Sequence, residues 1–135
     1  MEENQEQQQP SGRRILIVED EQFISELYVR SLAKAGYNVK VIVDGLEALE
    51  SAQTNVYDII LLDIMLPNLT GTEILAKLRD KTATPNLRAK IIITTNLEMD
   101  EQHRMAMEAQ ADGYIVKAEV TPKELVAYLD QLQLN

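Results

Sequence analysis

Apolar residues recur along the chain in short runs, which are separated by longer segments whose apolar residues follow a helical period. Short apolar runs bounded by turn residues are typical of strands that are buried on both faces. We therefore expect five strands, at residues 14–18, 39–43, 59–62, 90–95 and 113–116.

The segments between these runs carry helix signals. In the first segment, five apolar residues at helical spacing stop before Gly36, which suits the left-handed conformation that ends many helices; they are Ile24, Leu27, Tyr28, Leu32 and Ala35. Further helix starts are predicted at Asp44, Thr70 and Thr121, each followed three residues later by glutamate. Pro122 then occupies the first position of the last helix.

Residues 99–109 form the least marked helical segment. Their helix propensity is good, but the apolar stripe is thin and consists of Met99, His103 and Met107. His103 is the only histidine of the chain and has no second metal ligand nearby in the sequence. We expect it to face solvent.

Alternating strands and helices predict right-handed crossovers, and therefore an α/β fold with a parallel sheet covered on both faces. Residues 1–12 are rich in Gln and Glu and are expected to form a disordered tail. Residues 13–135 suit one domain. Because the chain ends just after the apolar stripe of the last helix, we expect any effector to be a separate chain.

Composition narrows the function classes. The formal net charge is -9 with a pI near 4.6, and no Lys/Arg cluster is present, so we expect no direct DNA binding. No apolar stretch approaches a membrane span, and the acidic start does not resemble a secretory signal. Cysteine is absent. A cytoplasmic protein is expected.

Charged residues follow three of the expected strands, and parallel strands place their carboxyl ends on one edge of the sheet. Glu19, Asp20 and Asp63 would meet there, opposite Lys117. Two like charges about 4 Å apart cost about 4 kcal/mol at an effective dielectric near 20, so a divalent cation is expected. A site with few oxygen ligands that stays open to water favours magnesium.

Some of these residues also have a plainer interpretation. Glu19 and Asp20 could serve only the dipole of the first helix, although that would not explain Asp63 and Lys117. Lys117 supplies a point charge that can pair with Asp63 at rest and with phosphate oxygens later. Thr95 ends the fourth strand and could donate its hydroxyl to the same oxygens, or be an ordinary strand-end threonine.

Taken in order, four segments resemble the receiver domain of two-component response regulators: residues 15–21 (ILIVEDE), 61–71 (LLDIMLPNLTG), 91–95 (IIITT) and 111–117 (ADGYIVK). The resemblance covers residues 13 to 134. It implies a flavodoxin-like, doubly wound fold with five parallel strands in the order 2-1-3-4-5 and helices on both faces.

The resemblance also implies roles for the charged residues. Asp63 matches the aspartate that accepts a phosphoryl group from a phosphohistidine, carried by a sensor histidine kinase or a histidine phosphotransfer protein. Glu19 and Asp20 match the acidic pair that holds Mg²⁺, together with the Asp63 carboxylate and the backbone carbonyl of Met65. Lys117 matches the lysine that contacts the phosphoryl group.

The resemblance further implies a switch. Thr95 matches the residue that supplies the switch hydroxyl. Thr95 is a better match than Thr94 because it lies 22 residues before Lys117, the spacing expected by similarity. Tyr114 matches the aromatic residue that turns inward when this hydroxyl moves. The face formed by the fourth helix, fifth strand and fifth helix would then bind an effector protein in trans. Similar proteins often form dimers through their last two helices, and the sequence leaves the question of a homodimer open.

Two positions depart from the family pattern, and two more, Met65 and Leu97, are the variable positions that flank the phosphoryl group. Ala118 replaces the usual proline after the lysine, which predicts a trans peptide bond and a shifted loop, because a cis bond before a residue other than proline costs about 2.5–4 kcal/mol. Asn96 is bulkier than usual and should slow phosphodonors. Met65 and Leu97 cannot polarise a water for attack, which predicts slow loss of the phosphoryl group.

Two other function classes are alternatives to this interpretation. A phosphohydrolase of the haloacid-dehalogenase type would carry a second aspartate two residues after Asp63, where this chain has Met65. A receiver-like scaffold that binds partners without phosphorylation stays open as the alternative. The leading interpretation is a phosphoacceptor that assists its own phosphorylation and slow dephosphorylation without being a turnover enzyme.

Overall fold

The computed structural model describes residues 12–80, 82, 84, 86–96 and 101–134. The predicted tail, Leu97 and Met99 therefore lie outside the described residues, apart from Gly12. Strands and helices alternate as expected: β1 (Arg14–Val18), α2 (Gln22–Lys34), β2 (Asn38–Ile42), α3 (Gly45–Ala52), β3 (Ile59–Asp63), α4 (Gly71–Leu78), β4 (Lys90–Thr95), α5 (Glu101–Gln110), β5 (Gly113–Val116), a 3₁₀ turn (Lys117–Glu119) and α6 (Pro122–Asp130).

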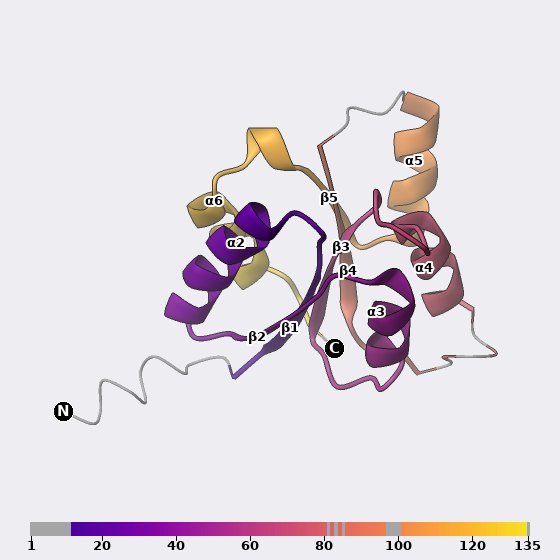
Figure 1. Cartoon of the computed structure of the whole chain (residues 1–135), viewed down its shortest axis with the longest axis horizontal. Helices are drawn as coiled ribbons and strands as arrows, with labels where there is room; N and C mark the ends of the chain where they lie inside the picture. Colours follow the sequence, from indigo (N-terminus) through magenta and orange to yellow (C-terminus); the bar gives the residue numbers. More distant parts are fainter. Residues whose placement is uncertain (1–11, 81, 83, 85, 97–100, 135) are drawn as a thin grey trace.

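The five strands form one parallel sheet in the order β2-β1-β3-β4-β5. Helices α2 and α6 pack on one face, and α3, α4 and α5 cover the other (Figure 1). The predicted flavodoxin-like fold and strand order are confirmed. Successive strands are added on one side of β1 and then on its other side, so the strand order reverses between β1 and β3. These two strands are parallel neighbours, and their carboxyl ends lie side by side.

Alternation along the central strands creates two cores. Ile15 and Ile17 of β1 pack on the α2 and α6 side, whereas Leu16 and Val18 pack on the side of α3, α4 and α5. All residues of β3 are buried, which explains why its sequence is a continuous apolar run before Asp63. The sheet is therefore a rigid support for whatever follows β1 and β3.

The predicted helix starts are confirmed. The Asp44 side chain accepts a hydrogen bond from the backbone N–H three residues later, over 3.0 Å. Thr70 and Thr121 each complete a reciprocal capping box with the glutamate three residues on. Helix α2 ends before Gly36, whose φ of +99° lies in the left-handed region that favours glycine.

Three details differ from the predicted pattern or refine it. Strand β2 begins one residue earlier than expected, and β3 extends through Asp63. In α5, only Met107 of the described residues is buried; His103 is exposed, as predicted, so the predicted apolar stripe through His103 is wrong. No described peptide bond is cis, which confirms the trans bond before Ala118, and the chain continues there as a 3₁₀ turn.

Candidate functional site

The residues that follow β1, β3 and β5 meet at the carboxyl edge of the sheet. Glu19 and Asp20 follow β1, Asp63 is the last residue of β3, and Lys117 begins the turn after β5. One carboxylate oxygen from each of the three acids lies within 4.8 Å of the other two. The structure thus brings together the four charged residues that the strand ends indicated.

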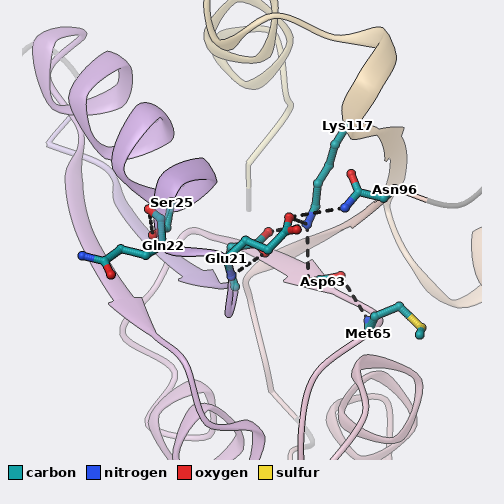
Figure 2. Close-up of polar contacts among 8 residues, drawn as sticks. Glu21, Gln22, Ser25, Asp63, Met65, Asn96 and Lys117 are labelled. Atoms are coloured by element: carbon teal, nitrogen blue, oxygen red, sulfur yellow. Dashed lines mark hydrogen bonds and ion pairs between the residues drawn. The ribbon is translucent and has the colours of Figure 1, made fainter.

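Lys117 is the centre of this cluster. Its Nζ atom lies 2.5 Å from Oε1 of Glu19, 3.3 Å from Oδ2 of Asp63 and 3.7 Å from Oε1 of Glu21. Figure 2 shows the lysine reaching down from its strand end toward Glu21 and Asp63. The predicted pairing with Asp63 is present, but the shortest contact is with Glu19. Lysine and glutamate are both almost fully buried, with side chains 3% and 1% exposed.

Two buried carboxylates share one buried ammonium group, so the buried part of the site carries an unbalanced negative charge. Burial raises the pKa of Glu19 to about 7, against the hydrogen bond from Lys117, and the charge of Asp63 adds to the rise. Burial lowers the pKa of Lys117, but its hydrogen bond with Glu19 and the charge of Asp63 outweigh that effect and leave the pKa raised. The site therefore favours an added proton or cation.

Asp63 is held from several sides. Its Oδ1 atom accepts a hydrogen bond from the backbone N–H of Met65 over 3.1 Å, while Oδ2 faces Lys117. The Met65 side chain is 61% exposed and points away from the carboxylates (Figure 2). Behind Asp63, α4 begins at Gly71, where a Cβ atom would lie 2.2 Å from the Asp63 carbonyl oxygen. This close approach fixes the backbone that carries the carboxylate.

The donor set fits a small, hard divalent cation. Glu19 and Asp63 are buried, whereas Asp20 is exposed, so the three oxygens would leave open positions for water. Among the residues that the structure describes, these three are the ones that could hold Mg²⁺. A contribution from the Met65 carbonyl stays a prediction.

Thr95 ends β4, the neighbour of β3, and Tyr114 lies one strand further away on β5. In register, Thr94 pairs with Asp63 and Thr95 pairs with Val116 on the opposite neighbour. Thr95 is fully buried at the end of β4. Tyr114 is half-buried on β5 and lines a groove of about 550 Å³ between α5 and α6. Their switching roles stay predictions.

Sequence reasoning missed the position of Glu21 and the hydrogen bond of Asn96. Glu21 directly precedes α2, is half-exposed, and contributes the third acidic oxygen near Lys117. The Asn96 side-chain amide donates to the same oxygen of Glu21 over 3.3 Å. The only signal was that Glu21 continues the acidic run after β1.

The fold and the acid–lysine site are those of a signalling domain. The family model of the response regulator receiver domain matches residues 15–130, and the chain belongs to this family. Receiver domains of response regulators are signalling domains rather than classical enzymes. Within the part of the chain that the structure describes, no helix is long and apolar enough to cross a membrane.

Among its relatives, the chain is 41% identical over 105 residues to response regulator ArlR of Staphylococcus saprophyticus and 39% identical over 104 residues to regulatory protein VanRB of Enterococcus faecalis. Each match covers 77% of this chain and 45% of the relative, so the chain spans under half the length of these relatives.

Solved structures are similar over most of the chain. One is a CheY-like receiver domain protein from Methanospirillum hungatei, with a TM-score of 0.75, 31% identity and coverage of 90% of this chain and 93% of that one. Another is chemotaxis protein CheY4 of Vibrio cholerae, with a TM-score of 0.75, 28% identity and coverage of 91% and 100%. A DNA-binding response regulator of the LuxR family from Staphylococcus aureus is 26% identical, with a TM-score of 0.75 and coverage of 88% and 97%.

Proposed function

We propose that this domain is a phosphorylation-dependent switch in which Asp63 accepts a phosphoryl group from a phosphohistidine. The donor would be a sensor histidine kinase or a histidine phosphotransfer protein. One observation carries the proposal: the Asp63 carboxylate lies 3.3 Å from the ammonium of Lys117 and within 4.8 Å of oxygens from Glu19 and Asp20. This arrangement suits a carboxylate that must receive a highly charged group.

In the proposed reaction, a carboxylate oxygen of Asp63 attacks the phosphorus atom of the phosphohistidine. The new O–P bond forms as the P–N bond breaks, and the electron pair leaves with the imidazole, which takes up a proton. Such a transition state is loose and spreads negative charge over the phosphoryl oxygens. Lys117 is placed to offset that charge.

Glu19, Asp20 and Asp63 would hold Mg²⁺, with the Met65 carbonyl as a further ligand. When bound, the ion supplies charge neutralisation for phosphoryl transfer. Met65 carries no group that could polarise a water molecule, which supports slow loss of the phosphoryl group. Leu97, the second residue of that hypothesis, lies outside the described residues.

The output would be a change of partner binding on the face of α5, β5 and α6. A phosphorylated residue carries nearly two negative charges at neutral pH, enough to attract the hydroxyl of Thr95 at the end of β4. Tyr114 lines the groove of about 550 Å³ on this face, two strands from Asp63. Repacking of Tyr114 would therefore alter a surface that an effector protein in trans could bind.

Intact mass spectrometry after incubation with phosphoramidate and Mg²⁺ tests the proposal. We expect one added phosphoryl group on the wild type and none on Asp63→Asn. Asp44→Asn is a matched control, because Asp44 also follows a strand at this edge and asparagine caps helices as well as aspartate does; it should be phosphorylated like the wild type. No added group on the wild type would overturn the proposal and favour the phosphorylation-independent scaffold.

A further inference from the structure

Two exposed side chains from different loops meet at the site. Glu21 belongs to the loop between β1 and α2, and Asn96 directly follows β4. In the sheet, β1 and β4 are the two neighbours of β3, which ends in Asp63. A contact between these loops therefore spans the carboxyl end of the strand that carries Asp63.

The contact also involves Lys117. Oε1 of Glu21 accepts a hydrogen bond from the Asn96 amide over 3.3 Å and lies 3.7 Å from Nζ of the lysine. Figure 2 shows Asn96 and Lys117 both pointing toward Glu21. The lysine side chain is only 3% exposed, although Glu21 beside it is 50% exposed and Asn96 is also exposed. The bridge thus places two exposed side chains next to a buried ammonium group.

From this geometry we infer that Asn96 and Glu21 form a latch across the mouth of the Asp63 site, which limits access to Lys117 and Asp63. The inference rests on the proposed function, and it assigns Asn96 a different action from simple bulk. If bulk alone mattered, any side chain of the same size would obstruct the site equally. A latch instead requires the hydrogen bond, so the effect of Asn96 depends on Glu21.

Four variants separate the two actions. Asn96→Leu keeps the approximate size of the side chain and removes the donor, whereas Asn96→Ala removes both. Each is made in the wild type and in Glu21→Ala. All the altered side chains are exposed, so the variants should fold, which circular dichroism checks.

The first measurement needs no phosphodonor. Acetylation of Lys117 by acetic anhydride is followed by peptide mass spectrometry, with the exposed Lys123 as internal reference. The second measurement is the rate of Asp63 phosphorylation by phosphoramidate with Mg²⁺. We expect Asn96→Leu and Asn96→Ala to raise both rates about two- to fivefold, the factor that corresponds to a net hydrogen bond of about 0.5–1 kcal/mol. Neither should have an effect in the Glu21→Ala background.

Two results would overturn the latch. One is acceleration by Asn96→Ala alone, with Asn96→Leu like the wild type, which is the signature of bulk. The other is an effect of Asn96 that persists unchanged in Glu21→Ala. If the wild type takes up no phosphoryl group, the proposed function fails separately, and the acetylation of Lys117 still supports or overturns the latch.

Discussion

Raising the pH from about 5 to about 8 should remove stability that Glu19 contributes to the metal-free domain. Glu19 and Asp63 are buried beside a single ammonium, Lys117, and a proton on Glu19 balances the charge. Water around the unfolded chain solvates each carboxylate separately, so the unfolded chain has no such need. The folded domain therefore binds this proton more tightly than the unfolded chain does.

The sign and size follow from the pKa. Burial raises the pKa of Glu19 from 4.5 to about 7. Its contribution to the free energy of unfolding is fully present below pH 4.5 and is lost as the pH rises through about 7. At about 1.4 kcal/mol for each pKa unit, this difference corresponds to about 3 kcal/mol.

Urea unfolding, followed by circular dichroism in the presence of a chelator, measures this contribution when the wild type is compared with Glu19→Gln. Glutamine has the size of the protonated acid and cannot titrate, so the difference between the two proteins cancels the titration of groups that do not contact Glu19. We expect the stability of the wild type relative to Glu19→Gln to fall by up to about 3 kcal/mol over this pH range. Glu50→Gln, at an exposed position, is the control for the substitution itself. A flat difference for Glu19→Gln would refute the reasoning.

Two further predictions concern the support of the site. Gly71→Ala should destabilise the domain by about 1–3 kcal/mol and slow phosphorylation, because the alanine Cβ would lie 2.2 Å from the carbonyl oxygen of Asp63. Urea unfolding would measure the stability and intact mass spectrometry the phosphorylation. Thr72→Ala, at an exposed position of the same helix, is the control. Thr121→Ala should lose about 1 kcal/mol of stability with the capping box of α6, while Asp63 is phosphorylated at the wild-type rate.

The fold could be predicted closely because local and tertiary signals agree. Strands β1 and β3 are buried on both faces, which forces continuous apolar runs, and the caps at Thr70 and Thr121 mark helix starts by chemistry that is local to the chain. Helix α5 was harder to place, since among its described residues only Met107 is buried. A helix with so little buried surface leaves a weak periodic signal.

The sequence predicts which residues lie together at the ends of the strands, but it does not predict the individual contacts between them. A parallel sheet brings Glu19, Asp63 and Lys117 to one edge whatever the rotamers are. That Lys117 lies closer to Glu19 than to Asp63 depends on the path of the chain after β5 and on side-chain torsions. Burial raises the pKa of Glu19 against this pairing with Lys117, and the charge of Asp63 adds to the rise. No sequence pattern could have indicated this balance.

The contact between Glu21 and Asn96 depends on the identity of the two residues as well as on the topology of the sheet. Because β1 and β4 flank β3, the loops after them always face each other across the end of β3. Two strand spacings separate these loops, roughly 10 Å, so short side chains could not meet. Here a glutamate and an asparagine are long enough to form a hydrogen bond of 3.3 Å. The latch is therefore a property of this pair of residues and not of the fold, and exchanging either residue should remove it while the sheet stays unchanged.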